Sequence, residues 1–190
     1  MNKVKLDEIA EVVSGLSYRR YLSEIGENYE VIVQRSIKKD GVLDDFETLK
    51  LKTENIKPHH LTKPDDVLMK MPYPYDVVCV SQPGLVISDR IAIIRLKRGY
   101  DPSFIAHLLT NAHIKKQLYE FSSTERIPHA SLKQIKELEL SVPDFETQRK
   151  YGELLDLINQ KISEDLKVVD YDRNLKEGIL NKLWGDLNEI

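Results

Sequence analysis

The sequence predicts an α+β globular domain followed by one long C-terminal helix of the coiled-coil type. Short runs rich in β-branched residues fill the first half of the chain, helical patterns follow them, and a last strand-like run ends at Pro143. Proline cannot donate to a strand ladder and disfavours helical geometry in the residue before it, so Pro143 marks a boundary. We therefore expect two domains, residues 1–143 and residues 144–190.

The first elements are expected close to the N-terminus. Residues 3–6 form an extended run, and residues 7–13 predict a short helix that Gly15 ends. The polar, basic and aromatic segment 16–21 is typical of a surface loop. Residues 29–34 are rich in Tyr, Val and Ile and predict a strand.

The middle of the chain predicts the centre of the sheet. Residues 67–71, 76–80 and 91–96 are short, apolar and bounded by Pro, Gly or Asp, as strands are. Pro102 then opens a helix over residues 103–121, in which apolar residues recur three and four positions apart. Two shorter elements complete the domain: a helix over residues 131–138 and a strand over residues 138–142.

Beyond Pro143 the pattern predicts one helix from about residue 146 to residue 184, with Asp144 as its N-cap. Apolar residues recur there in a heptad-like stripe that Arg173 and Lys176 interrupt. At ~1.5 Å per residue the helix would be roughly 58 Å long, which one small domain cannot cover. We therefore expect dimerisation through this stripe, whose apolar positions are Tyr151, Leu155, Ile158, Ile162, Leu166, Val169, Leu180 and Leu183. The alternative is a hairpin that folds back on the domain after a break at residues 170–172.

Composition restricts the class of protein. The chain has 190 residues, of which 41% are hydrophobic and 31% are charged, as in folded globular proteins. No apolar run approaches the ~20 residues that cross a bilayer, so we expect no membrane contact and a cytoplasmic location. Cys79 is the only cysteine, and its apolar neighbours predict a buried thiol.

The sequence shows no recognisable catalytic constellation. It lacks the glycine motifs that bind nucleotides, the histidine motif of zinc proteases and a nucleophile elbow. The neighbours His59 and His60 are expected to be an exposed loop pair rather than a metal site. Tyr73 and Tyr75 flank Pro74 and are expected to pack over a sheet edge, with base stacking as the alternative. We therefore expect no enzyme, no cofactor and no metal.

Charge indicates where nucleic acid would bind. The net charge is −3; residues 144–190 carry 7 Lys and Arg against 11 Asp and Glu, which leaves 21 against 20 in residues 1–143. Any DNA-binding face must therefore be a local patch. Side chains suited to phosphate contact and base reading gather in three loops, at residues 18–21, 35–39 and 124–129.

Several ordered segments resemble one protein family. Residues 5–15 (KLDEIAEVVSG) resemble a family opening of the form LGDIAxxxSG, and residues 65–69 resemble a GDVL strand with Asp65 in place of glycine. Residues 101–109 resemble a PxFLxYxL helix. The most specific match is residues 132–162, which include Gln148 and the run LLDLINQKI. These segments resemble the specificity subunits of type I restriction-modification systems, over most of the chain.

This resemblance implies a target recognition domain whose loops read about half of a bipartite DNA sequence, followed by a spacer helix. A full-length member has two such halves with antiparallel helices, and this chain has one. The resemblance therefore implies a non-catalytic homodimer on double-stranded DNA. It also implies a methyltransferase subunit as partner, which methylates adenine with S-adenosylmethionine, and the restriction subunit as a further candidate partner.

The loops supply the candidate DNA contacts. Phosphate contacts are expected from Arg19, Arg20, Lys38, Arg126 and Lys133. Base contacts are expected from Tyr18, Arg35 and Gln82. A competing hypothesis has the chain insert its helix into a specificity subunit or a methyltransferase complex and regulate it without reading DNA.

Overall fold

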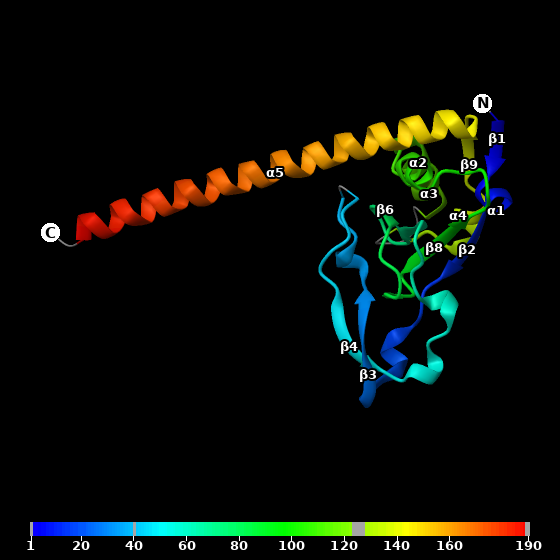
Figure 1. The fold of residues 1–190 in the computed structure, drawn as a ribbon, viewed down its shortest axis with the longest axis horizontal. Helices are drawn as coiled ribbons and strands as arrows, with labels where there is room; N and C mark the ends of the chain where they lie inside the picture. The colour runs from blue at the N-terminus through cyan, green and yellow to red at the C-terminus, as the bar shows by residue number, and fades with distance from the viewer. Residues whose placement is uncertain (1, 40, 123–127, 189–190) are drawn as a thin grey trace. The chain divides into compact units, whose positions relative to one another are not determined.

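The structure is a computed structural model that describes residues 2–39, 41–122 and 128–188. The chain forms two compact units, residues 1–155 and residues 156–190. Mixed sheets and helices build the first unit, which also contains the start of the long helix α5 (Phe145–Asn188) (Figure 1). The rest of α5 supplies the second unit. The predicted α+β class and the long C-terminal helix are both confirmed.

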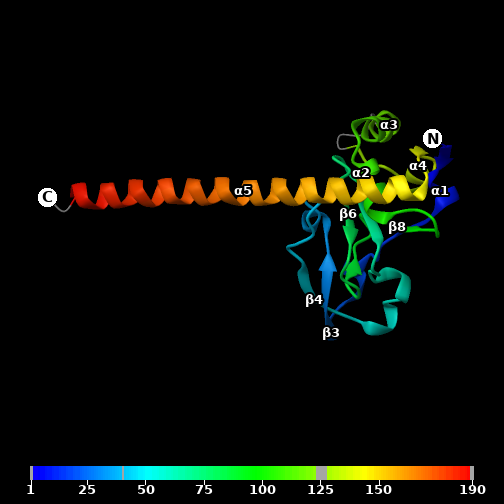
Figure 2. The ribbon, with the colours of Figure 1, turned by 45° about the horizontal axis from the view of Figure 1, so that its top comes forward.

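A four-stranded antiparallel sheet forms the centre of the globular unit (Figures 1 and 2). Its strands, in spatial order, are β2 (Ala10–Ser14), β8 (Ile91–Leu96), β5 (Asp66–Lys70) and β6 (Val77–Val80). The three strands predicted for the middle of the chain are confirmed, with ends within one residue of the prediction.

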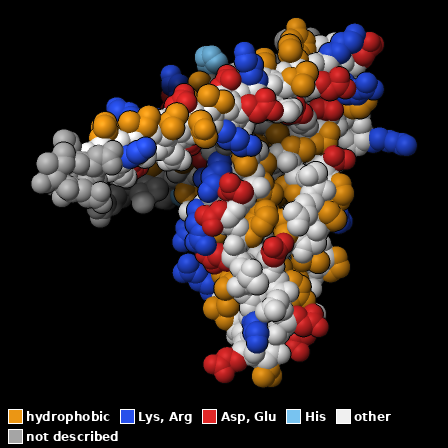
Figure 3. Space-filling view, turned by 60° about the vertical axis from the view of Figure 1, so that its left-hand side comes forward, with side chains coloured by type: hydrophobic (Ala, Val, Ile, Leu, Met, Phe, Trp, Pro, Cys, Tyr) orange, Lys and Arg blue, Asp and Glu red, His pale blue; other side chains and the backbone are white. Residues whose placement is uncertain are grey.

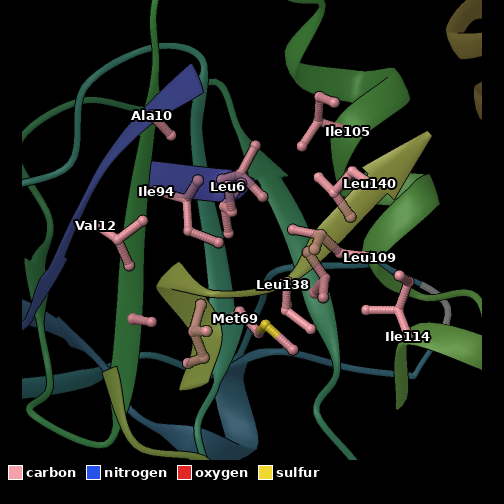
Figure 4. Close-up of a cluster of buried hydrophobic side chains, with 14 of the residues drawn as sticks. Leu6, Ala10, Val12, Met69, Ile94, Ile105, Leu109, Ile114, Leu138 and Leu140 are labelled. Atoms are coloured by element: carbon pink, nitrogen blue, oxygen red, sulfur yellow. The ribbon is translucent and has the colours of Figure 1, made fainter. Parts of the chain in front are cut away.

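Both faces of the central strands are buried, which explains their continuous apolar sequences. Successive side chains of a strand point to opposite faces. Val67 and Ile94 therefore join the largest core cluster, together with side chains from the helices (Figure 4). Leu68 and Ile93 pack on the other face in a second cluster that includes Ile32. Since neither face of β5 and β8 is open, contacts with a ligand must come from the segments that connect the strands.

The helix predicted over residues 103–121 is interrupted. The structure has α2 (Pro102–Leu109) and α3 (Ala112–Ser122) instead. The side chain of Asn111 accepts a hydrogen bond from the backbone N–H of His113 at 2.9 Å, so Asn111 starts a new helix rather than extending the first. Asp101 caps α2 by accepting from the N–H of Phe104 at 2.8 Å. The short helix α4 (Leu132–Lys136) follows the capping box of Ser131 and Gln134.

The helix predicted over residues 7–13 is wrong in its second half. The structure has β1 (Asn2–Lys5), the one-turn helix α1 (Leu6–Ile9) and then β2. Ala10 and Val12 are buried and pair with β8, so sheet pairing overrides the local helical pattern. β1 pairs with the last strand, β9 (Glu139–Val142), which confirms the strand before Pro143.

A three-stranded sheet was only partly predicted. Its order is β4 (Glu47–Leu51), β3 (Leu22–Ile32) and β7 (Val86–Ile87), of which only the end of β3 was expected. The described residues of the unit also form the 3-10 helices η1 (Tyr18–Tyr21), η2 (Gln34–Ser36), η3 (Thr53–Asn55) and η4 (Pro58–His60). The segment expected as a surface loop at residues 16–21 is therefore partly core, because Leu16 and Tyr18 are buried.

The start of α5 is fixed to the globular unit by polar contacts. Asp144 accepts hydrogen bonds from the backbone N–H and the hydroxyl of Thr147, at 3.0 and 2.9 Å, and the backbone bond lowers the pKa of Asp144. Buried Gln148 accepts from the N–H of Asp101 at 3.0 Å, and a Cβ at Gly152 would lie 2.7 Å from the Asp101 carboxylate. The N-cap prediction is confirmed, and the hairpin alternative is wrong because α5 continues through residues 170–172.

Candidate nucleic-acid interface

An open groove of about 910 Å³ on the globular unit brings three connecting segments together. These segments are η1, η2 and the turn between β7 and β8. The charged side chains that line the groove are Arg19, Arg20, Arg35, Glu47, Asp89 and Arg90, with Gln34 and His129 beside them. Four guanidinium groups against the carboxylates of Glu47 and Asp89 leave a surplus of positive charge in the groove, as DNA binding by a nearly neutral domain requires.

Gly15 lets the first and third segments meet. The N–H of Leu16 donates to the carbonyl of Ile87 at 2.6 Å, and the N–H of Asp89 donates to the carbonyl of Leu16 at 3.0 Å. A Cβ at Gly15 would collide with the carbonyl oxygens of Ile87 and the residue after it. Only glycine permits this approach, which places η1 beside the turn that carries Arg90.

The turn that carries Arg35 is fixed by a buried hydroxyl. Ser36 Oγ accepts from the N–H of Val33 at 3.1 Å and donates to the carbonyl of Asp45 at 2.9 Å. Asp45 has a φ of 57°, a left-handed conformation that side chains other than those of Asn and Asp seldom adopt. The hydroxyl of Ser36 therefore holds both η2 and the strained Asp45.

Arg35 forms ion pairs with two carboxylates, those of Asp45 and Glu47. Its Nε lies 3.1 Å from Asp45 Oδ2, and its Nη1 lies 2.7 Å from Glu47 Oε1. The second oxygen of Glu47 accepts a hydrogen bond from the Tyr18 hydroxyl at 3.4 Å. The Arg35 side chain is nevertheless 55% exposed, so its remaining N–H groups face solvent.

The other three arginines of the groove differ from Arg35 in that they are not paired with carboxylates of the described residues. Arg19, Arg20 and Arg90 are exposed, and they form no ion pair within the part of the chain that the structure describes. The guanidinium of Arg19 lies 6.0 Å from the ring centre of Tyr18, and a hydrogen bond with the Tyr18 side chain raises the pKa of Arg19. These three guanidinium groups are open to an anion.

The predicted DNA contacts fall into two groups. Tyr18, Arg19, Arg20 and Arg35 are brought together in the groove. Tyr18, however, is only 6% exposed, so it supports Glu47 rather than offering its ring to a base.

The remaining predicted contacts do not line the groove. Lys38 pairs with Asp44 at 3.1 Å, Gln82 is exposed in the loop after β6, and Lys133 lies on α4 beside Glu137 at 3.9 Å. Arg126 lies outside the described residues. These four positions stay predictions.

Arg90, Glu47 and Asp89 are the charged groove residues that the sequence did not predict. Arg90 lies in the turn between β7 and β8, and β7 is only two residues long. The signal that could have found it is an Asp-Arg pair between two apolar runs, which is typical of an exposed turn. Glu47 lies at the start of β4, which was missed altogether.

The apolar stripe predicted on α5 is exposed. Tyr151 is 54% exposed and Leu155 is half-buried against the globular unit. The remaining stripe residues are between 43% and 55% exposed: Ile158, Ile162, Leu166, Val169, Leu180 and Leu183. Apolar side chains are visible along the helix in Figure 3.

The histidine pair, the tyrosines beside Pro74 and the single cysteine were also considered as functional residues in the sequence. His59 and His60 lie in η4 with ring centres 4.1 Å apart, and burial lowers the pKa of His60. Among the described residues, no group of three His, Cys, Asp or Glu is placed to hold a metal ion. Tyr75 is buried in the core, Tyr73 is exposed, and Cys79 is half-buried rather than fully buried. No helix among the described residues is long and apolar enough to cross a membrane.

Solved structures of specificity subunits share the fold. The HsdS subunit from Thermoanaerobacter tengcongensis matches with a TM-score of 0.68 and 16% identity, over 88% of this chain and 44% of that one. The S subunit of the type I restriction-modification system from M. genitalium matches with a TM-score of 0.54 and 21% identity, over 86% and 40%. A chain from a structure on assembly and conformational transition of the type I R-M system matches with a TM-score of 0.63 and 17% identity, over 86% and 39%. The chain thus spans less than half the length of each.

The sequence itself identifies the family. Residues 1–183 match the family model described as type I restriction modification DNA specificity domain. This chain therefore belongs to that family, as its ordered segments predicted. A search of curated protein sequences finds no match.

Proposed function

We propose that the chain is the DNA-specificity subunit of a type I restriction-modification system. Residues 1–143 would be the target recognition domain, which reads half of a bipartite site through the groove. Residues 144–190 would be the spacer and dimerisation helix. The observation that carries the proposal is the groove with its four arginines, in a chain whose family is a DNA specificity domain.

In this proposal the chain recognises DNA and catalyses nothing. Its partners are double-stranded DNA in the cytoplasm, an adenine methyltransferase subunit and, in a restriction complex, the restriction subunit. Two copies joined through α5 would present two identical half-site readers, so the target would be palindromic. The exposed apolar stripe of α5 supports this association, because single helices seldom leave such a stripe uncovered.

DNA binding is tested by removing the two unpaired arginines of η1 from the intact chain. Arg19→Ala with Arg20→Ala should weaken binding to all duplexes alike and lower the slope of log K against log salt by about 2, because each lost phosphate contact removes about 0.9. Arg149→Ala is the matched control, since Arg149 is exposed and lies outside the groove. An unchanged slope would favour the competing regulator hypothesis.

Dimerisation is tested by two neighbouring valines of α5. Val169 lies on the predicted stripe and is 43% exposed, whereas Val168 is 59% exposed and lies about 100° around the helix. Val169→Asp should convert a dimer to a monomer in light scattering, because it places a charge in the helix interface. Val168→Asp should leave the dimer intact. A wild-type chain that is monomeric by itself would contradict the homodimer.

A further inference from the structure

We propose that Arg35 is the specificity-determining side chain of the groove and that it reads a guanine. This inference rests on the proposed DNA-binding function and deepens it. It sharpens the expectation from the sequence, in which Arg35 contacts a base and Arg19 and Arg20 contact phosphates. The structure adds the base that Arg35 reads and adds Arg90 to the phosphate contacts.

The charge around Arg35 argues against a phosphate contact. Its guanidinium is paired with both Asp45 and Glu47, and Lys38 Nζ lies 3.8 Å from the same Asp45 oxygen and 3.1 Å from Asp44. These five groups together carry a charge of −1. A phosphate brought to the free side of Arg35 would meet two carboxylates of its own sign. The oxygen and nitrogen acceptors on the edge of a base are neutral and do not meet this repulsion.

The geometry of Arg35 suits a bidentate contact. A guanidinium has five N–H groups, and the two ion pairs use one on Nε and one on Nη1. Two N–H groups on Nη2 and one on Nη1 remain, and no other described residue accepts from them. A guanidinium that presents one donor on each Nη to a base matches O6 and N7 of guanine in the major groove, the commonest specific contact of arginine.

The left-handed backbone of Asp45 is consistent with a need to hold the Arg35 side chain in one position. Asp45 keeps its left-handed backbone because the buried Ser36 hydroxyl binds its carbonyl, and Glu47 is held in turn by Tyr18. A side chain that contacts a base benefits from being held in place, because less side-chain conformational entropy is lost when DNA binds. A phosphate contact needs no such positioning, and Arg19, Arg20 and Arg90 form no ion pair among the described residues. Glu47 and Asp89 attract the Arg19 guanidinium without pairing with it.

The test is a selection from a randomised double-stranded DNA library, with the full chain in complex with its methyltransferase subunit. Wild-type protein should enrich a guanine at one position of each half-site. Arg35→Ala should lower the preference for that guanine by roughly 5- to 150-fold and leave the other positions and the salt slope unchanged. Arg35→Lys should lose the same preference, because lysine keeps the charge but cannot donate two parallel hydrogen bonds to one base.

Glu47→Gln tests the carboxylate that holds Arg35. It should reduce the guanine preference and steepen the salt slope, because Arg35 becomes available to phosphate.

Arg90→Ala is the matched comparison within the groove. It should weaken binding to every sequence and lower the salt slope by about 0.9, with the base preferences unchanged. If Arg35→Ala instead weakens all sequences equally, Arg35 contacts phosphate and the inference is wrong, while the proposed function stands. If the wild-type complex enriches no sequence at all, both the inference and the proposed function fail.

Discussion

Arg95 and Arg35 both pair with carboxylates, and their surroundings give them different tasks. Arg95 lies on β8 and binds Asp66 through Nε at 2.9 Å and Nη2 at 3.1 Å, with the carbonyl of Leu61 at 2.9 Å as a third acceptor. Its side chain is 14% exposed and that of Asp66 only 3%. Arg35 and its carboxylates are between 25% and 55% exposed. The buried pair is part of the scaffold, whereas the exposed cluster can exchange solvent for a ligand.

The largest effect in the comparison of Arg95 with Arg35 is expected when the buried guanidinium of Arg95 is removed. Arg95→Met should lower the free energy of unfolding by about 3–5 kcal/mol, because Asp66 would be left as an uncompensated buried charge. Urea unfolding of the variant measures this loss. The loss should be nearly the same in 0.05 M and 0.5 M salt, since buried pairs are poorly screened. A loss below about 1 kcal/mol would mean that Arg95 behaves as a surface residue.

The next largest effect is expected at Gly15, where the segment before η1 approaches the turn between β7 and β8. Gly15→Ala should destabilise the fold by about 1–3 kcal/mol, because the new methyl group overlaps two backbone carbonyls and the segments must separate. DNA affinity should fall with it, since η1 and the Arg90 turn move apart. Gly178→Ala is the control: nothing lies within 4 Å of that position, and alanine favours the helix. Equal effects at the two glycines would refute the close approach.

The exposed cluster should matter little to folding. Arg35→Ala should change the free energy of unfolding by less than about 1 kcal/mol, and the effect should vanish at high salt, because exposed pairs are well screened. The unfolding midpoints of this variant and of Arg95→Met, measured side by side, give the contrast directly. A large, salt-independent loss for Arg35→Ala would assign the cluster to the scaffold.

The smallest effect is expected from His60. Burial lowers the pKa of His60 below 6.5, so the folded chain binds fewer protons than the unfolded chain. The contribution to stability is fully present above about pH 6.5 and declines as the pH falls through the folded pKa. The N–H of Lys57, which donates to His60 Nδ1 at 3.2 Å, loses its acceptor there. Unfolding midpoints at pH 7.5 and pH 5.5 should differ less in His60→Gln than in the wild type.

Local pattern predicted the elements with a clear apolar signal. The three central strands were found as short apolar runs bounded by Pro, Gly or Asp, and α5 was found because its apolar residues recur three and four positions apart. Residues 10–13 were misassigned because Val12 and its neighbours satisfy a helical period locally, and only the partner strand β8 decides between the alternatives. The break at Asn111 depends on one side-chain hydrogen bond, which a short apolar period cannot reveal.

The groove was harder to predict because its contacts are distant in sequence. Arg35 and Glu47 are 12 residues apart, and Ser17, which donates to Asp89, is 72 residues from it. The sequence indicated which loops carry arginine, and three of the four groove arginines were among the predicted residues. It did not indicate which of them are paired, and that pairing is what separates their proposed tasks. Figure 3 shows basic and acidic side chains interspersed on the face in view.

The two buried faces of the central sheet have a consequence for how such a protein changes over generations. The four groove arginines lie on η1, on η2 and in the turn between β7 and β8, and none lies on a strand of that sheet. Under the proposed function, a new DNA target could be acquired by exchanging these short segments while the packed sheet is inherited unchanged. The exchanged segments would have to keep the buried residues that join them to the core, such as Leu16, Tyr18 and Ser36. The domain is then a modular starting point for engineered specificity.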